Sequence, residues 1–172
     1  MKILIYVFPF LFFACSNNDD GSSEPILGMS PVYEQIDRMD IGNDAVRDFG
    51  ELGKIVYQDP YIFINETFRG IHVIDNSTPT DPKTIAFWKI PGAIDFTLKE
   101  NFLYAENGKD LITLDKTDIH DLKVLSIVED INPISNLSFP ANYTGWFECA
   151  DPSLGIVVSW EEKLLADPKC WR

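Results

Sequence analysis

Short apolar stretches alternate with polar turns through most of the chain. These stretches are rich in Ile, Val, Phe and Tyr, and turn-forming residues bound them, which is typical of β-strands. No amphipathic run of helical length accompanies them. We predict strands at residues 54–58, 61–67, 71–75, 84–90, 93–99, 102–105, 111–115, 124–129 and 155–160. The pattern therefore predicts an all-β chain.

The middle of the chain is repeated once. Residues 61–90 and 102–131 both run from an apolar strand through a polar turn to an apolar strand that ends in Asp, then through a polar linker to Lys and a third strand. The two aspartates, Asp75 and Asp115, are 40 residues apart. A period near 40 with several short strands is typical of a β-propeller blade or a related array. Such a unit cannot bury its apolar face alone and needs neighbours.

Residues 70–83, GIHVIDNSTPTDPK, resemble the core of the LVIVD-repeat family, in which a strand ends in an aliphatic–Asp pair before a Ser-x-Pro-x-x-Pro linker. Residues 111–115, LITLD, look like a second copy, although their linker (116–123) lacks both prolines. Residues 90–96 are similar to the bridge between blades in this family. The resemblance covers about residues 52–132. It implies a β-propeller-like fold in a surface or periplasmic protein and says little about activity.

Two repeats, at about 54–92 and 93–132, are fewer than the four to eight blades of a typical closed propeller. We expect an all-β repeat domain over residues 31–172, with a C-terminal cap at 133–172. Three outcomes stay open for its exposed edges. The chain self-associates into a homo-oligomer that closes a ring, its lead-in and tail cover the edges, or it is a shortened relative of marginal stability.

The composition adds limits on partners. The chain has 172 residues, of which 45% are apolar, and this is enough for one domain with a core. Its formal net charge of −13 repels nucleic acid, so no nucleic-acid partner is expected. The charge itself favours solubility, with binding of cations or basic partners as the alternative.

The N-terminus predicts export. Residues 1–14 have a basic start and an apolar run that is too short to span a bilayer but suits a signal peptide. Cys15 follows Leu-Phe-Phe-Ala, which resembles the lipobox of bacterial lipoproteins, where the cysteine is lipidated and becomes the mature N-terminus. Phe12 and Phe13 depart from the usual lipobox pattern. An ordinary signal peptide and an uncleaved anchor remain alternatives.

The residues after Cys15 are polar, small and acidic, and they predict a flexible tether over residues 15–30. This stretch is similar to lipoproteins of the Bacteroidetes group, in which such acidic residues often accompany export to the cell surface. Ser16 is not the Asp that retains some lipoproteins at the inner membrane. We therefore expect an outer-membrane lipoprotein, periplasmic or surface-exposed, held at the membrane by its lipid.

Two further cysteines, Cys149 and Cys170, predict a disulfide, because exported proteins commonly oxidise such a pair. Closing a loop of about 22 residues would stabilise the fold by about 3 kcal/mol. Free thiols and metal ligation are the alternatives. A metal site would need two more ligands, and neither His72 nor His120 is near in sequence, so we expect no metal and no cofactor.

Candidate catalytic residues are few. His72 lies within an apolar strand and is expected to be a hydrogen-bonded structural residue, whereas His120 lies in an exposed linker. No Gly-x-Ser-x-Gly motif is present. Asp75 and Asp115 are a recurring carboxylate pair, which a glycosidase would need. Their repetition instead favours a structural role, in which each carboxylate accepts hydrogen bonds from the following turn.

The C-terminal region is rich in aromatic residues, among them Tyr143, Trp146 and Trp160. They either form a sugar- or peptide-binding surface or pack the tail over an open blade edge. We therefore expect a non-catalytic, lipid-anchored protein with a binding or scaffolding role toward a protein or glycan ligand. The alternative is a surface glycan hydrolase or lyase that uses paired carboxylates.

Overall fold

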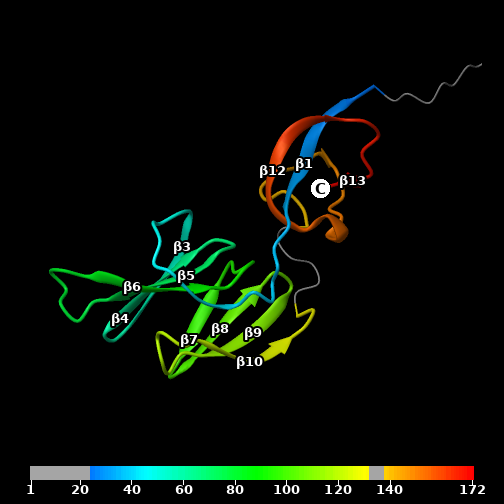
Figure 1. The fold of residues 1–172 in the computed structure, drawn as a ribbon. Helices are drawn as coiled ribbons and strands as arrows, with labels where there is room; N and C mark the ends of the chain where they lie inside the picture. The colour runs from blue at the N-terminus through cyan, green and yellow to red at the C-terminus, as the bar shows by residue number, and fades with distance from the viewer. Residues whose placement is uncertain (1–23, 132–137) are drawn as a thin grey trace, which may run out of the picture.

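The computed structural model describes residues 24–131 and 138–172. These residues form three β-sheets and no α-helix, so the predicted all-β class is confirmed (Figure 1). Two sheets come from the two repeats, and the third joins the two ends of the described chain. None of the three closes into a barrel. Of the expected features, residues 1–14 and Cys15 lie outside the described residues.

The first sheet is an antiparallel meander with one added strand, in the order β2-β6-β5-β4-β3. The strands of the meander are rich in apolar residues, and polar turns connect consecutive strands. The added strand, β2, pairs with β6 and so covers that edge of the sheet. The strands are β2 (Gly42–Asp44), β3 (Leu52–Gln58), β4 (Tyr61–Glu66), β5 (Gly70–Asp75) and β6 (Lys83–Lys89).

The second sheet is a four-stranded meander in the order β10-β9-β8-β7. β9 and β10 start 40 residues after β5 and β6, so the repeat in the sequence corresponds to a repeat of strands. The predicted strand at 93–99 starts only at Phe96, because the backbone of Ala93 turns back to bond the carbonyl of Ile90. The strands are β7 (Phe96–Lys99), β8 (Phe102–Asn107), β9 (Asp110–Asp115) and β10 (Lys123–Val128).

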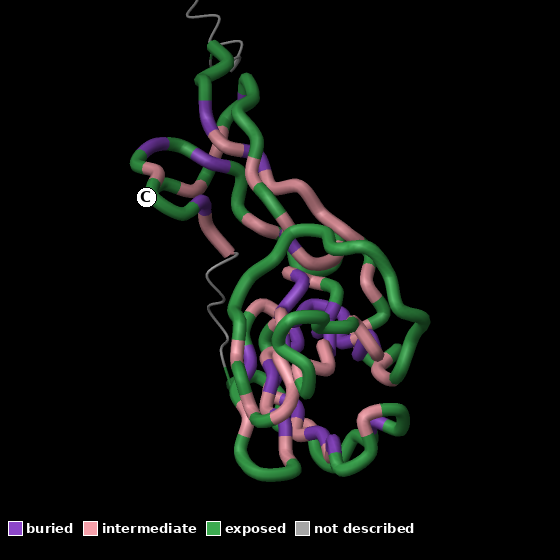
Figure 2. Tube along the Cα trace, turned by 90° about the vertical axis from the view of Figure 1, so that its left-hand side faces the viewer, coloured by how far each residue is buried: buried purple, intermediate pink, exposed green. Residues whose placement is uncertain are grey.

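The core lies between these two sheets. Phe63 and Val73 of the first sheet and Leu103 and Ile112 of the second are fully buried in one apolar cluster. Buried positions concentrate in this two-sheet body (Figure 2). Each such side chain contributes roughly 1.5–3 kcal/mol of transfer free energy. Each repeat thus buries one face against its neighbour, as the apolar pattern predicted.

The terminal sheet has the order β12-β1-β11-β13. Strand β1 pairs with β12 antiparallel along its whole length, and β11 lies parallel to β1. β1 starts at Ile26, inside the segment 15–30 that was expected to be a tether, because β12 supplies hydrogen-bonding partners for its last five residues. The elements are β1 (Ile26–Glu34), β11 (Trp146–Phe147), a 3₁₀ turn η1 (Pro152–Leu154), β12 (Ile156–Leu165) and β13 (Cys170–Trp171).

The lead-in and the tail therefore pair with each other in a sheet of their own. The predicted disulfide, Cys149–Cys170, joins this sheet with a Cα–Cα distance of 5.3 Å. In the described ranges, no helix has the length and apolar character needed to cross a membrane.

Candidate functional site

A pocket of about 360 Å³ lies where the terminal sheet meets the turn between β8 and β9. Its walls combine apolar side chains from β12 with polar and basic side chains from the β1–β2 connection and the β8–β9 turn. The residues that line it are Tyr33, Gln35, Ile36, Arg38, Gly108, Lys109, Ser138, Ala150, Asp151, Pro152, Ser153, Gly155, Ile156 and Val157. It therefore draws on segments that are far apart in sequence.

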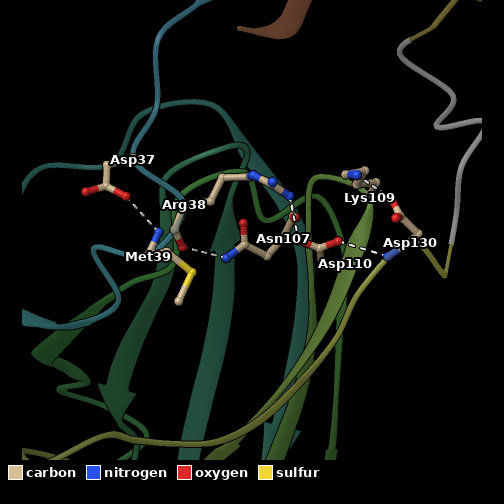
Figure 3. Close-up of polar contacts among 7 residues, drawn as sticks. All are labelled: Asp37, Arg38, Met39, Asn107, Lys109, Asp110 and Asp130. Atoms are coloured by element: carbon tan, nitrogen blue, oxygen red, sulfur yellow. Dashed lines mark hydrogen bonds and ion pairs between the residues drawn. The ribbon is translucent and has the colours of Figure 1, made fainter. Parts of the chain in front are cut away.

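Arg38 fixes the β1–β2 connection to the second sheet (Figure 3). Its guanidinium donates to Asp110 Oδ2 at 2.6 Å and to the carbonyl of Asn107 at 3.3 Å. The Asn107 amide donates back to the carbonyl of Arg38 at 2.8 Å. Because Asn107 and Asp110 are almost fully buried, this reciprocal clamp holds one wall of the pocket firmly.

Lys109 is the second basic group at the pocket. Its ammonium pairs with the carboxylate of Asp130, and this hydrogen bond raises the pKa of Lys109 above its ordinary value. The backbone N–H of Asp130 donates to Asp110 Oδ1 at 3.0 Å, which ties the end of β10 to the same network (Figure 3). Both basic side chains are therefore oriented by acidic partners.

The opposite wall is the loop before β12. Gln35 Nε2 donates to the carbonyl of Leu154 at 2.7 Å, and the backbone N–H of Asp151 donates to Tyr33 Oη at 2.6 Å. Asp151 also caps η1, since its carboxylate accepts from Ser153 N at 2.9 Å. Hydrogen bonds from Ser153 lower the pKa of Asp151, so this carboxylate stays ionised at neutral pH.

The pocket can hold a ligand with both polar and apolar surface. Arg38, Lys109 and Gln35 offer donors, Asp151 offers an acceptor, and Ile36 and Ile156 offer apolar contact. A mixed lining with a few oriented polar groups is typical of small-ligand sites.

A second pocket, of about 390 Å³, lies between β12 and the end of the first sheet. Three carboxylates line it, from Glu34, Glu51 and Glu66. Glu34 is held by a bidentate ion pair with Arg69, at 2.6 and 3.0 Å. Glu66 is buried and contacts His72 Nε2 at 2.7 Å. Glu51 is exposed, so the three carboxylates have different surroundings.

The surroundings of His72 confirm its expected structural role. The ring is fully buried between Phe49 and Phe87, with ring centroids 4.6 and 4.8 Å away. Its partner Glu66 also forms an ion pair with Arg47 at 3.3 Å. This network fastens the segment before β3 to the first sheet.

Asp75 and Asp115 end equivalent strands and take the predicted structural role. The carboxylate of each accepts the backbone N–H two residues further on, from Ser77 and Thr117, at 2.8 Å in both cases. Hydrogen bonds from the side chains of Ser77 and Thr117, followed by those from their backbone N–H groups, lower the pKa of the two carboxylates. His120, in the same kind of linker, is exposed as expected.

The structure does not bring the three candidate aromatic residues into one surface. Trp146 pairs with Trp171 across β11 and β13, with ring centroids 5.1 Å apart, and Tyr143 Oη donates to the Trp146 carbonyl at 3.2 Å. Trp160 instead packs on Phe147, with centroids 5.7 Å apart. Because neighbouring strand residues point to opposite faces, Trp146 and Trp160 lie on opposite faces of the terminal sheet.

The pocket residues had no sequence motif that could have revealed them. Arg38, Lys109 and Gln35 lie in connections with no strand pattern, and only the fold brings them together. Among the residues that the structure describes, no group of three or more His, Cys, Asp or Glu side chains is arranged to hold a metal ion.

Fold and site together define an all-β protein of three sheets with a mixed polar and apolar pocket between the terminal sheet and the second repeat. No protein-family model, no curated protein and no solved structure matches this chain.

Proposed function

We propose that this chain is a lipid-anchored binding or scaffolding protein of the outer membrane or cell surface, built from propeller-like blades. The observation that carries the binding role is the first pocket, where Arg38 and Lys109 are held in place beside apolar side chains. A segment of a protein or a glycan suits this lining, because both present hydroxyl or amide groups next to apolar surface. The anchoring role is supported by the sequence around Cys15.

Binding is tested by probing the full chain against glycan and peptide arrays and measuring affinity for each hit. The double variant Gln35→Ala and Lys109→Ala removes two donors from the pocket, and it should weaken binding by about tenfold or more. Lys163→Ala is the matched control, because this exposed lysine lies on β12 outside the pocket lining. Equal affinity of both variants for every hit would exclude this pocket as the ligand site.

Anchoring is tested separately by replacing Cys15 with Ser. The variant should leave the membrane fraction, and mass spectrometry of the wild-type protein should find acyl chains on its N-terminal peptide. A Cys15→Ser variant that still sediments with membranes, together with an unlipidated wild-type chain, would contradict the proposed address.

One observation favours the alternative of a surface glycan hydrolase or lyase, namely the three carboxylates of the second pocket. A glycosidase needs one protonated and one ionised carboxyl group across the scissile bond. Exposed Glu51 and buried Glu66 line the same pocket, so that two carboxyl groups border one space. Turnover of a polysaccharide that disappears in both Glu51→Gln and Glu66→Gln, with folding preserved, would favour the enzyme over the binding protein.

A further inference from the structure

The two repeat sheets pack against each other through opposite faces. In the first sheet, Val56, Phe63 and Val73 are cross-strand neighbours on the face that enters the core. Phe63 corresponds to Tyr104 in the repeat, yet the second sheet buries the neighbouring position, Ala105. The first sheet therefore buries the face that carries Phe63, whereas the second sheet buries the opposite face, which carries Ala105.

Among the described residues, the other face of each sheet is therefore covered only in part or not at all. We call them the open face of the first sheet, which carries Ile55, Tyr57, Ile62, Ile64 and Ile74, and the open face of the second sheet, which carries Tyr104, Leu111, Thr113, Ser126 and Val128. The open face of the first sheet is equivalent in the repeat to the face that the second sheet buries. The open face of the second sheet is equivalent to the face that the first sheet buries.

Equivalent side chains in the two sheets differ sharply in exposure. Ile55 occupies the position in the first sheet that Phe96 occupies in the second, because each pairs with the equivalent residue of the next strand. Tyr57 is equivalent to Leu98 for the same reason. Phe96 is 3% exposed because the first sheet covers it, whereas Ile55 is 63% exposed and Tyr57 is 59% exposed. The open face of the first sheet thus presents apolar side chains at positions that the other repeat buries.

The segment before β3 covers only part of this face. Phe49 and Arg47 lie over His72 and Phe87, which belong to β5 and β6. Ile55 and Tyr57, which β3 contributes to this face at the other edge, remain exposed. Exposed apolar positions of this kind mark interaction surfaces.

The open face of the second sheet is the more polar of the two. Thr113 and Ser126 stand where the first sheet has Val73 and Ala86, while Tyr104 and Leu111 keep apolar surface and Val128 is half exposed. A contact through this face would be more polar than the intramolecular one, as in subunit interfaces that form after folding.

We propose that a second copy of this chain docks head to tail, with the open face of the second sheet in one copy against the open face of the first sheet in the next. This contact repeats the intramolecular packing of one sheet on the other, so the same type of interface continues from copy to copy. A head-to-tail contact of this kind gives a closed ring when the rotation from each copy to the next adds up to a full turn. Because each copy contributes two sheets, a ring of four to eight sheets contains about two to four copies.

The test measures the native mass of the full chain, purified in detergent, by light scattering and native mass spectrometry. Ile55→Asp disrupts one open face and Val128→Asp the other, and both side chains are exposed enough for the fold to tolerate the charge. Leu164→Asp is the control, since this side chain is 66% exposed on the terminal sheet. Circular dichroism verifies that each variant keeps its β-sheet content.

The wild type and Leu164→Asp should show a single oligomer of about two to four copies, whereas Ile55→Asp and Val128→Asp should each be monomeric. An equal mixture of the two monomeric variants, treated with a chemical cross-linker, should give a heterodimer. Ile55→Asp keeps the open face of the second sheet and Val128→Asp keeps the open face of the first sheet, so each supplies the face that the other has lost. A monomeric wild type would overturn the proposal. So would a Val128→Asp variant that keeps the wild-type mass, since this would indicate a symmetric contact through the first sheet alone.

Discussion

Trp88 joins the two repeats, and its replacement tests whether they unfold as one unit. The side chain is fully buried, its ring packs on Phe63 with centroids 5.3 Å apart, and its Nε1 donates to the carbonyl of Ile119 at 2.8 Å. Trp88→Phe loses the hydrogen bond and part of the ring, which should cost about 1–2 kcal/mol. Trp88→Ala also leaves a cavity and should cost about 3–5 kcal/mol.

The assay is urea and thermal unfolding, followed by far-UV circular dichroism and by tryptophan fluorescence. For a domain of this size, 3–5 kcal/mol corresponds to a melting temperature lower by roughly 6–20 °C. Trp171→Phe is the matched control, because Trp171 is 59% exposed and should change stability by less than about 1 kcal/mol. If Trp88→Ala and Trp171→Phe lowered the melting temperature equally, the inferred contact between the two sheets would be wrong.

Three further changes test other parts of the fold. Replacing both Cys149 and Cys170 with Ser should destabilise the terminal sheet by about 3 kcal/mol, seen as faster hydrogen exchange in β13 while β4 and β5 stay protected. The fold lowers the pKa of Asp75 and of Asp115, so their contribution to stability is present above a pH of about 4 and is lost as the pH falls through the lowered pKa. In the double variant Asp75→Asn and Asp115→Asn, the urea midpoint should therefore fall less between neutral and acidic pH than it does in the wild type. Gly70→Ala should prevent β5 from pairing normally with β6, because Gly70 has φ +151° and a Cβ there would collide with the backbone of β6, and a variant of wild-type stability would contradict this geometry.

The strands of the two repeats could be predicted because each carries its own signal. Runs such as those ending at Asp75 and Asp115 are dense in β-branched residues, and local polar turns fix their ends. The first half of strand β1 was expected to belong to the tether, because it has no strand pattern of its own. It is ordered by β12, more than a hundred residues later in the chain. Such long-range pairing leaves no local trace in the sequence.

The pocket and the aromatic residues illustrate a second limit. The sequence places Trp160 on a strand, but the face that Trp160 occupies relative to Trp146 depends on the register of β11, β1 and β12. In the same way, Arg38 and Lys109 become neighbours only because Arg38 bonds the β8–β9 turn. The chemistry of single positions is local, whereas their assembly is a property of the fold.

The connection from β1 to β2 links the pocket to the core. Beyond Arg38, the same connection leads to Asn43, whose amide donates to the carbonyl of Ile119 at 2.9 Å and accepts from Leu122 N at 2.7 Å. Trp88 donates to the same Ile119 carbonyl, so the linker of the second repeat is held by both β2 and β6. A ligand that bridges the terminal sheet and Arg38 would therefore stabilise a connection on which the contact between the two repeats depends. Since a ligand that binds only the folded state raises stability by mass action, its binding should protect the two-sheet body as well as the pocket walls.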